Sequence, residues 1–168
     1  DMKKENYDDL IFVLRSIENK SILLPDHIKN IKPFAFESCN INSIKIAEHS
    51  QLQSILANSF CNCSIESLFI PQSFEKFEDG WCKDAYNLKK VTISSLNKFY
   101  KNCEENHNII LGKSDRNEKI FDDLVFVGRE INYIRIPNYI KNIKPYACQN
   151  CHISDEYDRR IMMNRDDY

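Results

Sequence analysis

The chain has 168 residues, 23 of them basic and 25 acidic, which gives a formal net charge of −2 at neutral pH. This balance gives no electrostatic reason to expect a nucleic acid or an anionic membrane as partner. The length suffices for one domain with a contiguous core. The sequence has no run of 18 apolar residues, so we expect no membrane insertion by this segment, and its polar start lacks the pattern of a signal peptide.

The first predicted element is residues 8–15, DDLIFVLR, which return as DDLVFVGR at residues 122–129. At the second occurrence, a polar stretch joins this segment to an earlier apolar run, residues 109–111. Two apolar runs with a polar connection predict a hairpin-like insert, which we place at about residues 95–130. Only its second half is present at residue 8, and the repeat pattern stops after Ile153. We therefore expect the chain to be a window of a longer array.

Five short strands are predicted by apolar residues that alternate with one variable residue, as in a strand with one buried face. Successive full copies begin at Ile41, Ile65 and Leu88, steps of 24 and 23 residues that lie in the leucine-rich-repeat range. The next copy begins at Ile131, 43 residues later, so the irregular insert replaces one repeat. The apolar positions are Ile22/Leu24, Ile41/Ile44/Ile46, Ile65/Leu68/Ile70, Leu88/Val91/Ile93 and Ile131/Ile134/Ile136.

Each repeat continues past its strand with a second apolar pair, such as Ile28/Ile31, that carries the chain across the back. An aromatic, small and apolar cluster closed by cysteine follows, clearest in Phe34-Ala35-Phe36 with Cys39. We predict a short helix or 3₁₀ turn here, with its apolar side inward. Pro33 and its counterpart Pro145 suit the first turn of such a helix.

The stretch 23–41, LLPDHIKNIKPFAFESCNI, recurs at 135–153 as RIPNYIKNIKPYACQNCHI, and such self-similarity indicates a solenoid. The string I-P-x-x-I-x-x-I-x-P-[FY]-A-[FC]-x-x-C resembles the repeats of the BspA-like (Treponema-type) leucine-rich-repeat surface antigens of trichomonads and some oral bacteria. The likeness covers most of residues 8–153. It implies a curved solenoid with adhesive or interaction roles at a cell surface.

The predicted fold is therefore an α/β solenoid over residues 8–153. Each repeat would contribute one short parallel strand and one short helix or 3₁₀ turn, and the hairpin insert would interrupt the array. Residues 154–168 are mostly charged and lack the period, so we expect a frayed or disordered polar tail.

The seven cysteines are interpreted as small buried hydrophobes. Cys82 and Cys148 occupy the repeat position that holds Phe36 and Phe60 in sister copies. The alternative is a zinc site at Cys148-x-x-Cys151, but a structural site needs four ligands and only one such pair occurs. We expect no metal and no cofactor. A second alternative, pairing of stacked equivalent cysteines between repeats, stays open, although an odd count excludes full pairing within the chain.

No catalytic motif is found, and we predict that the domain is not an enzyme. The four histidines (His27, His49, His107 and His152) lie on different repeats or turns, and Trp81 is assigned to packing. The adjacent carboxylates Glu104/Glu105 and Asp122/Asp123 are expected in solvated turns, and the basic residues Lys29/Lys32 and Lys141/Lys144 on a solvated face. A hydrolase would need a polar pocket near His107 and these carboxylates.

The candidate binding surface is the exposed face of the predicted parallel sheet. Its variable strand residues are Leu23, Lys45, Phe69, Thr92 and Arg135, with Tyr133 beside them. Exposed Phe, Tyr and Arg are residue types favoured at interface hot spots. The alternative is that these are ordinary solvent-facing positions.

The predicted function is protein or host-surface binding at a cell surface, a localisation that rests on the resemblance. The alternative is an intracellular, cytoplasmic interaction scaffold with reduced cysteines. Two sequons, at Asn19 and Asn62, would permit glycosylation in a secreted protein.

Overall fold

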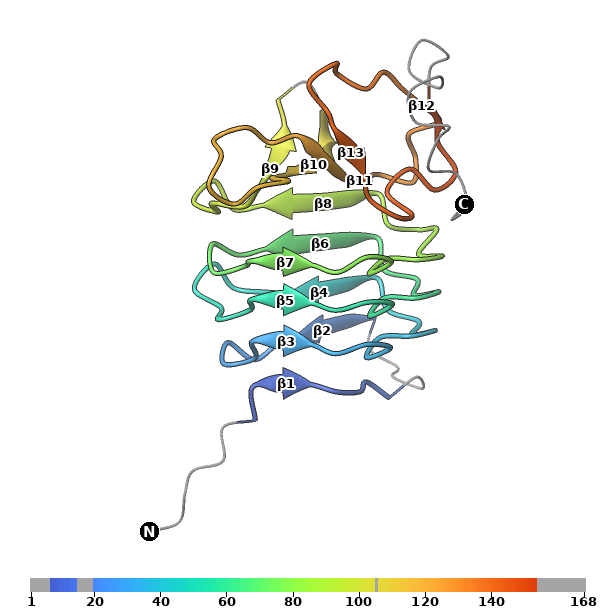
Figure 1. Ribbon diagram of the computed structural model, residues 1–168. Helices are drawn as coiled ribbons and strands as arrows, with labels where there is room; N and C mark the ends of the chain where they lie inside the picture. The colour runs from blue at the N-terminus through green and yellow to red at the C-terminus, as the bar shows by residue number, and fades with distance from the viewer. Residues whose placement is uncertain (1–6, 15–19, 105, 154–168) are drawn as a thin grey trace.

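The computed structural model describes residues 7–14, 20–104 and 106–153 and shows repeats stacked one on another (Figure 1). Fourteen strands occur in these residues. They are β1 (Asp9–Leu10), β2 (Ser21–Leu23), β3 (Asn30–Ile31), β4 (Ser43–Lys45), β5 (Ser54–Ile55), β6 (Ser67–Ile70), β7 (Lys76–Phe77), β8 (Lys90–Ile93), β9 (Tyr100–Cys103), β10 (Asn106–Gly112), β11 (Asp123–Val127), β12 (Tyr133–Ile134), β13 (Asn142–Ile143) and β14 (His152–Ile153).

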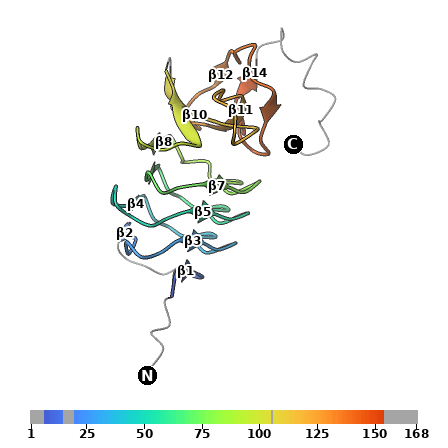
Figure 2. The same ribbon diagram turned by 60° about the vertical axis from the view of Figure 1, so that its left-hand side comes forward.

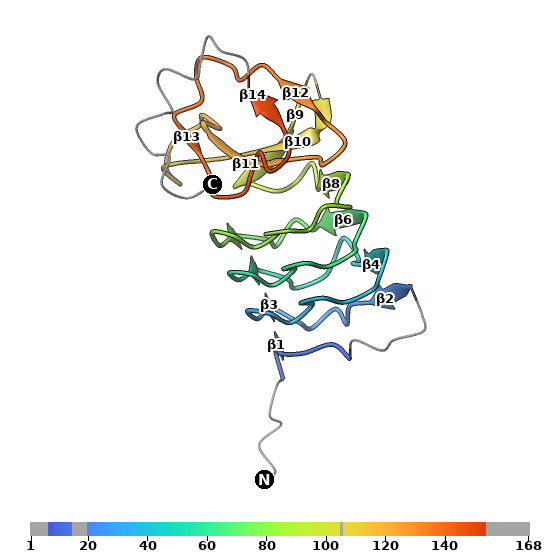
Figure 3. The ribbon, with the colours of Figure 1, turned by 90° about the vertical axis from the view of Figure 1, so that its right-hand side faces the viewer.

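Each regular turn contributes two strands, one to each side of the solenoid. The predicted strands form a parallel sheet in the order β2-β4-β6-β8. A second parallel sheet, β1-β3-β5-β7, runs along the opposite side, as the side view in Figure 3 shows for β2 and β4 against β3. It is built from the apolar pairs that carry the chain across the back. The sequence predicts the chain's course there but not the strand pairing.

The predicted helix or 3₁₀ turn is wrong: the described residues contain no helix, and hence none that could span a bilayer. Each repeat instead makes a run of tight turns. In the first repeat the amides of Ala35, Glu37 and Cys39 donate to the carbonyl three residues earlier (3.1 Å each). The alternate amides, of Phe36 and Ser38, donate to the next repeat (2.9 Å each). Two of these five backbone donors therefore join repeats, which a helix would not allow.

Two residues with positive φ in each repeat impose this geometry. Phe34 (62°) and Ser38 (55°) hold these positions in the first copy. Pro33 followed by a positive φ is the pattern of a type II turn, with proline second and a left-handed residue third. The proline that suggested a helix start therefore marks a turn. The equivalent pairs are Asn58/Asn62, Gly80/Asp84 and Tyr146/Asn150.

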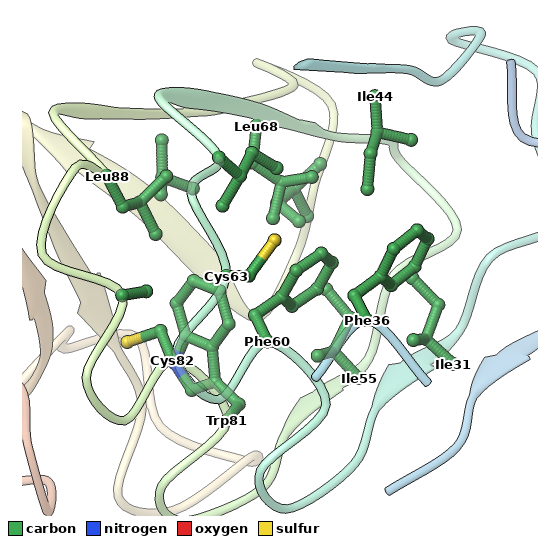
Figure 4. Close-up of a cluster of buried hydrophobic side chains, with 14 of the residues drawn as sticks. Ile31, Phe36, Ile44, Ile55, Phe60, Cys63, Leu68, Trp81, Cys82 and Leu88 are labelled. Atoms are coloured by element: carbon green, nitrogen blue, oxygen red, sulfur yellow. The ribbon is translucent and has the colours of Figure 1, made fainter. Parts of the chain in front are cut away.

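The core lies between the two sheets and the turns (Figure 4). Phe36 and Phe60 are fully buried and stack with ring centroids 4.8 Å apart, while Trp81 meets Phe60 edge-on at 6.2 Å. The packing assigned to Trp81 is thus confirmed. Cys82 continues this row in place of phenylalanine and is 1% exposed, which confirms the prediction that it is a small core residue.

The irregular segment is a hairpin that rises from the last regular turn, as Figures 1 and 2 show. Strands β10 and β11 pair antiparallel, and β9 pairs with the other edge of β10. On its far side β11 pairs in parallel with β13. A second apolar cluster, including Leu111, Leu124 and Ile136, fills this end.

Candidate functional site

The outward face of the sheet β2-β4-β6-β8 carries four of the six predicted binding residues in one column. Leu23 lies opposite Lys45, and Phe69 opposite Thr92. Leu23 is 71% exposed and Lys45 is exposed, while Phe69 and Thr92 are half-buried. The aromatic ring of Phe69 packs partly against the core. The face therefore has a half-buried ring at Phe69 and an exposed apolar side chain at Leu23, with the cationic side chain of Lys45 between them.

A second column of three serines and a lysine flanks this one. Ser21, Ser43, Ser67 and Lys90 lie opposite one another in successive strands, and the hydroxyl of Ser43 donates to that of Ser21 (3.1 Å). Serines leave this side of the face flat. A partner can therefore reach the backbone plane without displacing large side chains.

The other two predicted residues are not part of this column. Tyr133 and Arg135 belong to the turn of β12, which pairs with β14, and the insert stands between β8 and that turn (Figure 1). Tyr133 is 64% exposed and Arg135 is exposed. They line a separate cavity of about 240 Å³ with apolar walls that include Ile109, Leu111 and Ile134. The single continuous column predicted from the repeats is thus broken by the insert.

Sequence reasoning did not find a cleft of about 240 Å³ between β7 and the insert. Phe77, Trp81 and Tyr100 lie along its apolar part. The phenol oxygen of Tyr100 accepts the Phe77 N–H (3.1 Å), and burial raises the pKa of this tyrosine. The 43-residue step between the repeat copies at Leu88 and Ile131 was the one feature of the sequence that indicated an interruption of the stack here.

Arg116 closes one side of this cleft. Its guanidinium donates to the Glu75 carbonyl (3.1 Å), lies 3.7 Å from the Glu75 carboxylate and covers the Phe99 ring at 4.6 Å. In earlier repeats the equivalent carbonyls, of Lys29 and Gln53, accept N–H groups from the next strand. Arg116 of the insert therefore supplies the hydrogen bond to the Glu75 carbonyl that a next strand would otherwise donate.

The adjacent carboxylates Asp122 and Asp123 are not solvated, contrary to the sequence-based expectation: they are 1% and 3% exposed. Asp122 accepts from the amide and hydroxyl of Ser114 (2.9 and 2.7 Å) and pairs with Lys141 (2.8 Å). Burial opposes its ionisation, but the hydrogen bonds from Lys141 and Ser114 outweigh burial and lower its pKa. Asp123 pairs with Lys144 at 3.2 Å. Asp122 and Asp123 are therefore engaged in structural contacts.

The first basic pair also makes ion pairs. Lys29 meets Asp8 at 2.8 Å and Lys32 meets Asp9 at 3.2 Å. Hydrogen bonds from Asn30 and Lys32 lower the pKa of Asp9. Both lysine pairs thus lie on a partly solvated face, as predicted, and each lysine is also paired with a carboxylate.

Arg129 is 8% exposed and joins the regular turns to the C-terminal unit. Its guanidinium donates to the carbonyls of Ala147 (3.1 Å) and Tyr146 (2.9 Å) and to the Cys82 sulfur (3.3 Å). Burial raises the thiol pKa of Cys82 to about 11, although the arginine opposes that shift. The thiol is therefore a packing group that touches a cation, not an activated nucleophile.

The chemistry available to the other candidates is limited. The seven cysteines are free. Among the described residues, no group of three or more histidine, cysteine or acidic side chains is placed to hold a metal ion. His49 lies 2.8 Å from the Asp26 carboxylate on an exposed turn. The sequon at Asn62 lies in a tight turn, where its side chain donates to Ser38 (3.3 Å), and Asn19 lies outside the described residues.

Comparison with known proteins agrees with this architecture. The sequence matches the family described as BspA type leucine rich repeat region, in six copies over residues 11–111 and 95–155. Among curated proteins, none matches.

Three solved structures share the fold at less than 20% identity. The pneumococcal vaccine antigen PcpA has a TM-score of 0.67 at 19% identity, over 80% of this chain and 32% of that one. A leucine rich cell surface protein from Faecalibacterium prausnitzii has a TM-score of 0.65 at 17% identity, over 79% and 33%. A leucine-rich repeat protein from Eubacterium ventriosum has a TM-score of 0.60 at 19% identity, over 80% and 41%. The aligned part is thus less than half of each of those chains. The family match covers most of the sequence, and the chain belongs to the BspA-type leucine-rich-repeat family.

Proposed function

We propose that this domain is a non-enzymatic protein-binding module that acts at a cell surface and binds a protein or host-surface ligand through the outer face of β2-β4-β6-β8. The observation that supports it most directly is the in-register column of Leu23, Lys45, Phe69 and Thr92. Leu23 is 71% exposed and lies beside the cationic Lys45 and the half-buried ring of Phe69. Binding surfaces commonly combine such apolar anchors with polar contacts.

The size of this face sets the expected strength of binding. Four strands about 4.8 Å apart and at most four residues long present roughly 200 Å². A standard interface covers about 800 Å² on each partner. The face alone therefore predicts weak, transient binding, and a tight complex would extend onto neighbouring surface. Weak sites gain apparent affinity when several are presented together.

A binding role agrees with the environment of the carboxylates whose pKa is shifted. The ionised groups with clearly lowered pKa, such as Asp122 and Glu78, are held by lysines and backbone donors. The surface setting is supported by the family and by two relatives whose names describe a vaccine antigen and a cell surface protein.

The test of binding presents the biotinylated domain as tetramers on fluorescent streptavidin and measures attachment to host epithelial cells and matrix-coated wells. The double variant Leu23→Asp/Lys45→Glu should lose most of the attachment. A matched control, Tyr86→Ser/Ile120→Ser, changes two exposed side chains outside the sheet and should retain it. Equal attachment of the face variant and the wild type would refute the assigned face.

The test of location is antibody labelling of the native full-length protein on intact and permeabilised cells. Labelling of intact cells is the expected result. Labelling only after permeabilisation would overturn the surface role and direct the search to cytosolic partners.

A further inference from the structure

The chain contains one structural module twice, and the two copies differ in what covers them. Residues 7–14, YDDLIFVL, correspond to residues 121–128, FDDLVFVG. The carbonyl of Asp8 accepts the Lys29 N–H at 2.7 Å, and that of Asp122 accepts the Lys141 N–H at the same distance. Further along, Val13 and Val127 each donate to the alanine of their own turn at 2.9 Å. The backbone of the first copy is thus placed on its own turn as in the second.

The outward side chains of the two copies have opposite environments. Val125 and Phe126 are 4% and 0% exposed in the second copy. Their counterparts Ile11 and Phe12 are 71% and 54% exposed in the first. Beside them, Tyr7 and Leu14 are 74% and 68% exposed. Together these four large side chains expose roughly several hundred Å², an amount of apolar surface that marks interaction sites.

The second copy shows what covers this surface. Strand β10 pairs antiparallel with β11, with Ile110 opposite Phe126. The Phe126 ring packs 5.9 Å from Trp81, and Lys101 and Lys113 of the hairpin each lie 5.1 Å over Phe121. The cover is therefore one regular turn that ends in a β9–β10 hairpin.

Among the described strands, β1 pairs only with β3, and its other edge has the polarity that such a cover needs. The carbonyls of Asp8 and Leu10 accept from the strand β3 side. Because successive residues of a strand direct their backbone groups to opposite edges, those of Asp9 and Ile11 face away from β3. In the second copy, the corresponding edge of β11 is the one that β10 occupies.

We propose that the β1 end of the solenoid is a docking face for a further BspA-type unit, which adds an antiparallel strand of the β10 kind along β1 and covers Tyr7, Ile11 and Phe12. One position sets its specificity. A Cβ at Gly128 would lie 2.2 Å from the Lys89 carbonyl oxygen, whereas the first copy has Leu14 there. The partner unit must therefore leave room where the Lys89 backbone stands in the second copy.

The test uses the chain from Asp8 onwards with its own covering unit in place of residues 1–7, so that Phe121 takes the position of Tyr7. Residues 65–121 are placed directly before Asp8, which reproduces the junction between residues 121 and 122, and Leu14→Gly removes the predicted collision. Relative to the L14G chain without the addition, the chimera should melt at a higher temperature. The Ile11 amide should exchange at least about tenfold more slowly, because it gains a hydrogen-bonded neighbour.

Two controls make the result specific. Phe12→Ser in the chimera should abolish both gains, while in the unfused chain it should change the melting temperature little, because Phe12 is 54% exposed there. The chimera that retains Leu14 should show a smaller gain. Unchanged Ile11 exchange in the L14G chimera, or a gain that survives Phe12→Ser, would overturn the proposal. So would a concentration-dependent dimer of the unfused chain that Phe12→Ser dissolves, because the face would then belong to a second copy.

Discussion

Truncation of Phe60 tests whether the aromatic row holds the repeats together. Phe60 is fully buried between the parallel ring of Phe36 at 4.8 Å and the edge-on ring of Trp81 at 6.2 Å. A buried phenylalanine removes about 200 Å² from water, which at about 25 cal/mol per Å² is about 5 kcal/mol. Alanine retains part of that burial, whereas the lost ring contacts and the cavity add to the cost. We expect Phe60→Ala to lower the free energy of unfolding by about 4 kcal/mol.

Such a loss is a large share of the roughly 5 to 15 kcal/mol that stabilises a typical domain. The assay is urea unfolding followed by circular dichroism, with Phe12→Ala as the matched control. Phe12 is 54% exposed, so its truncation should cost about 1 kcal/mol or less. Because a solenoid unit contacts only its neighbours, amide exchange should accelerate first in β4 to β7. A loss below about 1.5 kcal/mol for Phe60→Ala would show that the row is not the main support of these turns.

Three further predictions concern backbone strain, pH and thiols. At Phe34, whose φ is 62°, Phe34→Gly should be about 1 kcal/mol more stable than Phe34→Ala in urea unfolding, because glycine alone adopts this conformation without strain; equal stabilities would argue against the turn. The folded-state pKa of Asp122 is depressed, so its contribution is complete above the unfolded value of about 3.9 and is lost as pH falls towards the folded one. Asp122→Asn should therefore lower the free energy of unfolding by about 1 to 2 kcal/mol at pH 7, a modest loss because Lys141 is 58% exposed. The difference in unfolding free energy between variant and wild type should narrow below about pH 4, and a difference that stays constant would contradict the pairing. Burial raises the thiol pKa of Cys63 to about 12 and of Cys82 to about 11. Iodoacetamide at pH 8 should therefore label both thiols only in urea, as read by mass spectrometry. Labelling of either thiol in the native protein would contradict the burial.

The helix prediction failed for a reason that is present in the sequence. Proline before an aromatic residue suits both the first turn of a helix and the second position of a type II turn. Asn58 and Gly80 in sister copies are residue types that tolerate positive φ, and they favoured the turn. An alignment of all the repeats indicates a turn at this position. The first and last copies alone do not, because they have Phe34 and Tyr146 there.

The candidate surface was predicted only in part. Alternation within a strand shows which residues face outward, so Leu23, Lys45, Phe69 and Thr92 could be placed in one column from spacing. That inference assumed that every strand joins the same sheet. The insert breaks the sheet after β8, which moves Tyr133 to the wall of a different cavity. The ion pairs of Asp122 were also missed, because their partners are distant in sequence.

Short-range periodicity alone determined the repeat, the outward residues and the buried position of Cys82, because each of these depends on which side of a strand or turn a residue occupies. Only the tertiary structure decided the second sheet, the cleft beneath the insert and the opposite environments of Phe12 and Phe126. Those features depend on which segment packs on which. Similar local patterns cannot encode that choice, since two closely similar sequences form the same module whether or not a neighbouring unit covers it.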